Sequence, residues 1–284
     1  MSIEIRNQHR VHGGTLRFCQ HASEATRTPM RFSAFTPPGE GPFPYLIFLS
    51  GLTSSEENFT VKAGAYRFAA EAGLAILNPD TSPRGENVPD HPDPDVGQAA
   101  GFYVDATEAP WSANFKMETY VTRDLIAAAE GAFPLDPARR GLCGHSMGGH
   151  GALTLAFRHP DCFQSLSAFA PICSPTRSTW GGKAFREYFG ADEGRWRGHD
   201  ATLLLEQGAG AAFDDILIDQ GLADPFLPDQ LNLDRFEAAA RAAGRPLTVR
   251  RHEGYDHGYF FITTFIADHI AFHAQRLRQP RAAL

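Results

Sequence analysis

The stretch that decides the fold runs from Arg140 to Arg158 and reads RGLCGHSMGGHGALTLAFR. Its first part is a short run of strand length, and its last part, Met147–Arg158, has apolar residues at helical spacing. Between them, residues 144–148 fit the pattern Gly-x-Ser-x-Gly. A serine in a tight turn between a strand and a helix is typical of a nucleophile elbow. The stretch therefore predicts that Ser146 is a nucleophile at the carboxyl end of a buried strand.

The residues around Ser146 have a physical reason to be small. An elbow serine adopts a strained backbone conformation that exposes Oγ, and Gly144 and Gly148 allow the strand and the helix to approach closely. The helix N-terminus also directs N–H groups at a developing oxyanion. The alternative interpretation is a glycine-rich helix start with a serine cap and no chemistry.

Outward from this stretch, short apolar runs alternate with helical patterns. Such runs are typical of strands buried on both faces, and their alternation with helices predicts a mostly parallel central sheet flanked by helices. We expect strands at 45–50, 74–77, 165–169, 215–219 and 247–250, and helices at 56–72, 117–131, 147–158, 230–243 and 259–278. The first forty residues alternate in polarity and predict an antiparallel hairpin at one sheet edge. We expect one α/β domain over residues 1–284, with a long loop at 80–100 near the carboxyl ends of the strands.

An elbow serine needs a histidine further along the chain and an acid between the two. His257 follows the strand at 247–251 in a loop and is the predicted base, while His252 at the strand end is the competing candidate. Asp224, in the loop after the strand at 215–219, is the predicted acid. Asp219 is the alternative acid, and we expect it instead to fix the loop by hydrogen bonds to backbone. Either aspartate can also be an ordinary turn residue.

The oxyanion needs a second donor from the loop after the early strand. That loop begins Leu49-Ser50-Gly51-Leu52, so the N–H groups of Leu52 and Met147 are the predicted pair. Backbone groups donate here, and the side-chain types therefore carry no information.

Composition excludes several other classes of protein. The formal net charge of −7 argues against a nucleic-acid binder, and the chain has no apolar run long enough to span a membrane. The start, Met1–Asn7, lacks an apolar signal core, which predicts a soluble cytoplasmic protein. The four cysteines lack Cys-x-x-Cys spacing, and we expect them to be small buried residues. His269 and His273 have helical i, i+4 spacing, but we expect exposed positions and no metal site.

Several longer segments give the sequence a family resemblance. Residues 49–53 (LSGLT), 78–85 (NPDTSPRG), 101–107 (GFYVDAT), 144–153 (GHSMGGHGAL) and 254–257 (GYDH) resemble the S-formylglutathione hydrolase (esterase D) family. The resemblance extends from about residue 3 to residue 277. It implies the α/β-hydrolase fold, no cofactor, a homodimer, and a triad at Ser146, Asp224 and His257. It also implies hydrolysis of S-formylglutathione to glutathione and formate in formaldehyde detoxification, with a side activity on short-chain acyl esters.

Two features depart from the family pattern. Many members have a cysteine near the oxyanion loop where this chain has Ser54, and the loop at 86–98 lacks a tryptophan that is often found there. Because glutathione is anionic, we expect positive charge at the pocket, and we take Lys62, Trp180 and Lys183 as candidate substrate contacts, with Arg84 also considered. A general short-chain carboxylesterase is the alternative function, and a non-catalytic binding protein on the same scaffold is a third.

Overall fold

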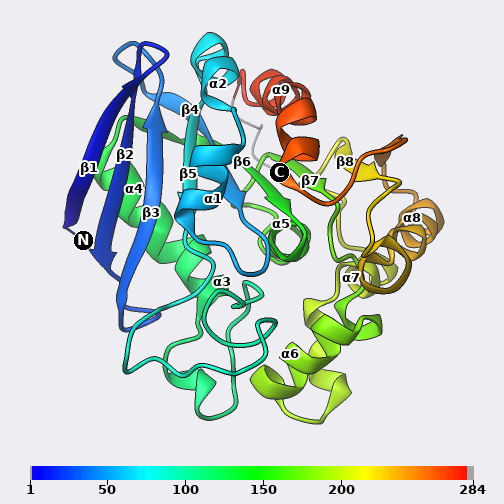
Figure 1. Ribbon diagram of the computed structural model, residues 1–284. Helices are drawn as coiled ribbons and strands as arrows, with labels where there is room; N and C mark the ends of the chain where they lie inside the picture. The colour runs from blue at the N-terminus through cyan, green and yellow to red at the C-terminus, as the bar shows by residue number, and fades with distance from the viewer. Residues whose placement is uncertain (1, 280–284) are drawn as a thin grey trace.

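A single nine-stranded sheet forms the centre of the computed structural model, which describes residues 2–279 (Figure 1). Its spatial order is β1-β2-β3-β5-β4-β6-β7-β8-β9. The strands are β1 Ile3–Val11, β2 Gly14–Ala22, β3 Pro29–Thr36, β4 Phe43–Leu49, β5 Ala75–Pro79, β6 Leu135–His145, β7 Ser165–Phe169, β8 Ile216–Gly221 and β9 Thr248–His252. The predicted domain limits, Met1 and residues 280–284, lie outside the described residues.

Strand directions divide this sheet into two parts. The strands β1, β2 and β3 pair antiparallel, and β3 pairs antiparallel with β5. From β5 to β9 in sheet order, every pair is parallel. The predicted mostly parallel sheet with N-terminal antiparallel strands is therefore confirmed, with three antiparallel strands where a hairpin was predicted.

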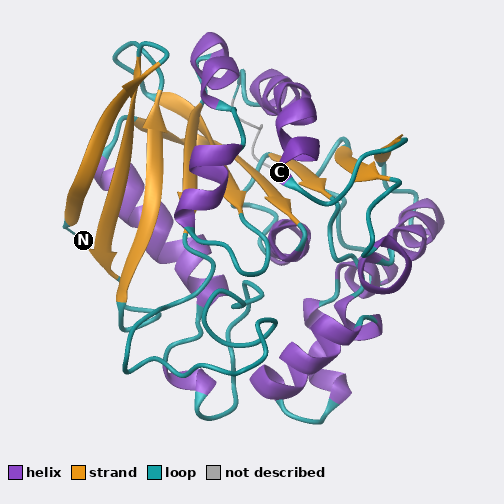
Figure 2. Ribbon diagram, viewed as in Figure 1, coloured by secondary structure: helices purple, strands orange, loops and turns teal. Residues whose placement is uncertain are grey.

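Helices cover the two faces of the sheet. The α-helices are α1 Glu56–Lys62, α2 Tyr66–Ala72, α3 Met117–Thr119, α4 Ile126–Ala132, α5 Met147–Arg158, α6 Thr179–Phe189, α7 Ala201–Glu206, α8 Leu233–Ala242 and α9 Tyr259–Arg276. Figure 2 shows α1 and α2 in front of the sheet and α4 behind it. The loops after β5, together with α6, lie beyond the carboxyl ends of the parallel strands (Figure 2). None of the helices within residues 2–279 is long and apolar enough to cross a membrane.

Two predicted helices differ from the structure. The helix predicted at 56–72 is broken into α1 and α2 at Gly64, whose φ of +66° is left-handed. The helix predicted at 117–131 exists, but its middle turn, Tyr120–Leu125, has π-helical hydrogen bonding. The spacing of apolar residues locates the buried face of both helices, but it does not show a local change of backbone conformation.

The parallel strands provide a rigid base for the loops at their carboxyl ends. Every residue of β5, β7 and β8 is buried, as expected for strands with helices on both faces. Adjacent registers align Leu49 with Gly144 and Phe169 with His145, so the ends of β4, β6 and β7 meet at one edge. Loops that follow these strands are consequently held close together.

The prediction that His269 and His273 are exposed is wrong. Both side chains are fully buried on the face of α9 that packs on the sheet. His273 contacts the hydroxyls of Ser165 (2.7 Å) and Ser167 (2.8 Å), and His269 contacts Ser167 at 2.8 Å. The serines of β7 form hydrogen bonds that offset the cost of burying these polar rings. The helical spacing of the two histidines does not reveal these partners.

Candidate active site

Ser146 occupies a strained turn between β6 and α5. Its φ of 59° and ψ of −118° lie in a region that residues other than glycine seldom adopt. The turn is fixed by its neighbours, because the N–H of Ser146 donates to the carbonyl of Phe169 at 3.0 Å and Ile172 N–H donates to the carbonyl of Ser146 at 3.2 Å. The side chain lines a pocket at the carboxyl edge of the sheet. The predicted strand–turn–helix setting of this serine is confirmed.

The two glycines of the motif are required by close backbone contacts. A Cβ added at Gly144 would lie 2.0 Å from the carbonyl oxygen of Gly148, and one added at Gly148 would lie 1.9 Å from that of Leu49. Both distances are far shorter than any permitted contact. The glycines thus allow α5 to start directly against β4 and β6.

Asp224 and His257 are brought together from two loops. Nδ1 of His257 lies 2.6 Å from Oδ2 of Asp224 in a hydrogen bond. Asp224 is held by further donors, since Gln220 Nε2 donates to Oδ2 at 3.1 Å and Phe226 N–H donates to Oδ1 at 2.8 Å. The Asp224 side chain is fully buried, and that of His257 is 14% exposed. A carboxylate fixed in this way orients the imidazole and favours a proton on Nδ1.

The loops that contain these two residues are hydrogen-bonded to each other. Leu222 N–H donates to the carbonyl of His252 at 2.9 Å, and Ala223 N–H donates to that of Tyr255 at 2.9 Å. A Cβ at Gly221 would lie 2.3 Å from the carbonyl oxygen of Tyr255, so glycine is required where the loops meet. The spacing between Asp224 and His257 is therefore set by backbone contacts.

Two aromatic side chains that the sequence analysis did not single out enclose the ring of His257. The His145 ring lies 4.5 Å from it between centroids, and the Phe226 ring lies 5.0 Å from it in an edge arrangement. Burial, with a smaller effect of His257, holds the pKa of His145 well below its usual range, so His145 is neutral. His145 precedes Ser146 in the chain, and Phe226 lies two positions after Asp224. This proximity to predicted site residues is the only indication of their role in the sequence.

The competing candidates, Asp219 and His252, do not line the pocket that contains Ser146 and contact each other instead. The carboxylate of Asp219 accepts hydrogen bonds from Arg250 at 2.6 Å and is 3.2 Å from Nε2 of His269. Its partners are side chains, so the predicted hydrogen bonds to backbone are wrong. The ring of His252 stacks on Phe265, 3.7 Å between centroids, and its Nε2 lies 3.2 Å from Asp219. Asp219 and His252 are thus engaged with Arg250, His269 and Phe265.

The loop after β4 passes directly over the serine. A Cβ added at Gly51 would lie 3.1 Å from Cβ of Ser146, so the peptide before Leu52 is next to it. Within residues 2–279, no acceptor receives the N–H of Leu52. Met147 is the first residue of α5, where N–H groups have no intrahelical acceptor. The two N–H groups predicted as donors therefore belong to the loop that contacts Ser146 and to the residue that follows Ser146 in the chain.

A pocket of about 500 Å³ surrounds Ser146 and His257. Its lining includes the three predicted contacts Lys62, Trp180 and Lys183. Lys62 lies at the end of α1 with its ammonium 5.7 Å from the ring centroid of Tyr259. The ammonium of Lys183 instead binds two pocket aspartates, which the sequence analysis did not identify: Asp93 at 2.8 Å and Asp95 at 3.1 Å.

Arg84 and the cysteines lie away from this pocket. Arg84 forms an ion pair with Asp80 and lines a different hollow.

Cys19, Cys143 and Cys173 are buried as predicted, whereas Cys162 is only half-buried. Burial raises the pKa of Cys19 to about 11 and that of Cys143 to about 12, so both thiols are protonated and unreactive.

Comparison with known proteins gives one consistent result. Residues 23–272 match the family model described as a putative esterase. S-formylglutathione hydrolases of Paracoccus denitrificans (strain Pd 1222) and of Mus musculus are each 47% identical to the chain, with 98% of this chain and 99% of theirs aligned. The solved structure of an S-formylglutathione hydrolase from Agrobacterium tumefaciens is 45% identical and covers 96% of this chain and 99% of its own, with a TM-score of 0.93. The nine-stranded sheet has the α/β-hydrolase fold, and the chain belongs to the S-formylglutathione hydrolase family of esterases.

Proposed function

We propose that the protein is a serine hydrolase that cleaves S-formylglutathione to glutathione and formate. The hydrogen bond of 2.6 Å between His257 and Asp224 carries the proposal, because it fixes an imidazole in the same pocket as the strained serine. A base oriented by a buried carboxylate beside a nucleophile is the arrangement that acyl transfer requires. The family membership supports the choice of substrate.

In the proposed reaction, His257 takes the proton of Ser146 Oγ as this oxygen attacks the formyl carbonyl. The N–H groups of Leu52 and Met147 receive the oxyanion, and Asp224 stabilises the imidazolium. Collapse of the tetrahedral adduct breaks the C–S bond, the imidazolium of His257 gives its proton to the departing sulfur, and glutathione leaves as the thiol, with formyl-Ser146 and neutral His257 remaining. Water then attacks this ester with His257 as base, and formate leaves as Ser146 regains its proton.

The charges of the pocket support an anionic substrate with one ammonium group. Lys62 forms no ion pair among the described residues, so its charge is available to a glutathione carboxylate. Lys183 is offset by Asp93 and Asp95, and this group carries a net charge of −1. We propose that Lys62 attracts a carboxylate and that the Lys183 group faces the substrate ammonium, with Trp180 as an apolar wall.

The alternative is a general short-chain carboxylesterase, which the match to an esterase family favours. The two functions differ in kcat/KM for S-formylglutathione relative to p-nitrophenyl acetate. We expect the thioester to be preferred by at least about 100-fold, because its glutathione moiety contributes binding energy in the transition state. Equal values would favour the general esterase, and failure of a fluorophosphonate probe to label the native protein would favour a binding protein.

Three further properties are proposed together with this function. The continuous sheet supports one domain, and a glutathione-dependent reaction supports the reducing cytoplasm as its compartment. A homodimer is the assembly that the family resemblance implies. Analytical ultracentrifugation at micromolar concentration tests the dimer, and a mass near the chain's 31.1 kDa would contradict it.

A further inference from the structure

The turn that contains Leu52 is held by a network from another part of the chain. The carbonyl of Ser54 accepts two hydrogen bonds, from Thr81 Oγ1 at 2.6 Å and from Arg84 at 2.7 Å. Thr53 N–H donates to the carbonyl of Ala99 at 3.0 Å. Both donors to Ser54, and Ala99, belong to the long loop after β5. This loop therefore fixes the backbone immediately after the proposed oxyanion donor.

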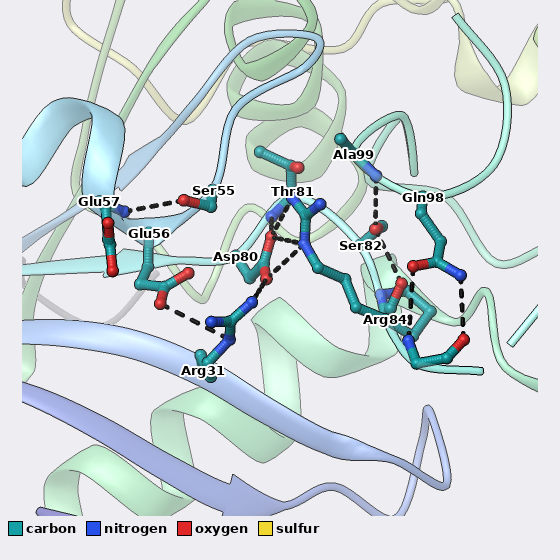
Figure 3. A network of polar contacts seen from close by, with 12 residues as sticks. Arg31, Ser55, Glu56, Glu57, Asp80, Thr81, Ser82, Arg84, Gln98 and Ala99 are labelled. Carbon is teal, nitrogen blue, oxygen red and sulfur yellow. Dashed lines mark hydrogen bonds and ion pairs between the residues drawn. The ribbon is translucent and has the colours of Figure 1, made fainter. Parts of the chain in front are cut away.

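The guanidinium of Arg84 is itself fixed by Asp80 (Figure 3). Its Nε and Nη2 each bind the carboxylate, at distances of 2.8–3.0 Å, and Asp80 is almost fully buried. A second guanidinium, that of Arg31, lies 3.6 Å from the same carboxylate and 3.6 Å from Glu56 (Figure 3). Arg31 is not bonded to Ser54, so the two arginines share Asp80 but only Arg84 reaches the turn.

The turn needs such support because its conformation is unfavourable. Thr53 has a φ of +63°, and a β-branched residue seldom adopts the left-handed region. Conformations of this kind persist where surrounding contacts determine them. The hydrogen bonds to Thr53 and Ser54 are contacts of that type, and Leu52 N–H lies at the start of the same turn.

We propose that Arg84, together with Thr81, is a positioning residue for the oxyanion hole. Through the Ser54 carbonyl, these side chains direct Leu52 N–H at the oxyanion, and neither touches a reacting atom. Arg84 lines a separate hollow of about 250 Å³ with Arg31 and Asp80, and none of these three residues lines the pocket that contains Ser146. The proposal rests on the proposed function, since it assigns the oxyanion donor of that reaction.

A misdirected donor affects the transition state more than the bound substrate. The charge on the oxyanion develops only in the transition state, so a loss of alignment lowers kcat and leaves KM nearly unchanged. Removing a whole oxyanion donor costs about 10²–10³ in kcat, and we expect a misaligned one to cost about tenfold. The Arg84→Lys substitution keeps the positive charge. A single ammonium cannot replace the planar guanidinium, which binds Asp80 through two nitrogens and the Ser54 carbonyl at the same time.

The test compares Arg84→Lys and Thr81→Val with the matched control Arg31→Lys. We expect kcat to fall about tenfold in the first two variants, with KM within twofold. The melting temperature of Thr81→Val should fall by only a few degrees, the loss of one buried hydrogen bond, and Arg31→Lys should keep its kcat. Binding of a glutathione trifluoromethyl ketone, which forms a tetrahedral adduct, is expected to weaken by the same factor as kcat/KM.

Wild-type kcat in folded Thr81→Val would overturn the proposal, and so would equal losses in Arg84→Lys and Arg31→Lys. If Arg84→Lys does not fold, Thr81→Val decides alone, because it removes one hydroxyl and no charge. The Ser146→Ala variant separates this outcome from the proposed function. Activity that survives Ser146→Ala contradicts the function itself, whereas activity lost there but retained in Thr81→Val contradicts only the positioning role.

Discussion

The carboxylate of Asp224 accepts a hydrogen bond of 2.6 Å from Nδ1 of His257, although the two residues are 33 positions apart in the chain. A few residues away, Asp219 is equally buried but bonds to Arg250 and His269. Hydrogen bonds from His269 and Arg250 outweigh the effect of burial and hold the pKa of Asp219 well below its usual range. One carboxylate thus orients His257, which lines the pocket, and the other ties β8 to β9 and α9.

This difference predicts opposite effects for two matched substitutions. Asp224→Asn is expected to lower kcat by up to about 10⁴, because an amide cannot stabilise the imidazolium and favours the wrong tautomer. Asp219→Asn is expected to keep most of the activity but to lose about 3 kcal/mol of unfolding free energy, because Arg250 loses its buried partner. Steady-state kinetics and urea unfolding of both variants check this. An equal or larger loss of kcat in Asp219→Asn would reverse the assignment of the acid.

The free charge of Lys62 predicts a substrate-selective effect. Lys62→Ala should raise KM for S-formylglutathione about fivefold and leave that for uncharged p-nitrophenyl acetate unchanged, because an exposed charge contact is worth about 1 kcal/mol. Higher salt should reproduce this change in the wild type. Lys116→Ala is the control, since the Lys116 ammonium binds the carbonyl of Ala106. Parallel changes in KM for both substrates would assign Lys62 to the scaffold.

The serine at position 54 predicts resistance to thiol reagents. Ser54 lines the pocket, while three cysteines are buried and Cys162 is half-buried. N-ethylmaleimide should leave the wild type active, and Ser54→Cys should make it sensitive, with protection by substrate. The Cys162→Ser variant is expected to behave as the wild type. Rapid inactivation of the wild type, prevented by substrate, would show an accessible thiol near the site.

Buried neutral histidines predict a loss of stability in mild acid. Burial lowers the pKa of His150 to about 3 and holds that of His273 well below its usual range. The unfolded chain binds these protons near pH 6.5 and the folded chain does not, so stability is complete above about pH 6.5 and falls below it. Below that pH, each such histidine lowers the free energy of unfolding by about 1.4 kcal/mol for every further pH unit. Urea midpoints at pH 7.5 and 5.5 check this, and equal midpoints would contradict it.

A control for that measurement is available on the edge strand. His9 lies in β1, where its ring is exposed in the folded protein as it is in the unfolded chain. His9→Asn is therefore expected to keep the wild-type difference between the two midpoints. If the two urea midpoints of this variant differed less than those of the wild type, surface charge and not the buried histidines would explain the acid sensitivity.

Local sequence signals predicted the parts of the fold that depend on local chemistry. The limits of β7 and α5 match the prediction, because apolar runs and glycine spacing are recorded in the chain itself. The burial of His269 depends on partners distant in sequence, and no local pattern contains them. The same is true of the bond from Arg84 to Ser54, which joins residues 30 positions apart.

The substrate contacts were only partly predictable for a related reason. The sequence identified Lys62 and Lys183 as candidate contacts for an anionic substrate, and both line the pocket. It does not reveal that Asp93 and Asp95 bind Lys183, because that pairing depends on how the long loop folds over α6. Charge counted along a chain therefore overestimates the positive charge of the pocket.

Hydrolysis of S-formylglutathione by Ser146→Ala tests the central claim most directly. The substitution removes only Oγ from a side chain that lies in the pocket, so the melting temperature should stay that of the wild type. Turnover should fall by about 10⁶, the loss expected when a nucleophilic serine is removed. A folded Ser146→Ala protein that kept a tenth of wild-type activity would contradict the account.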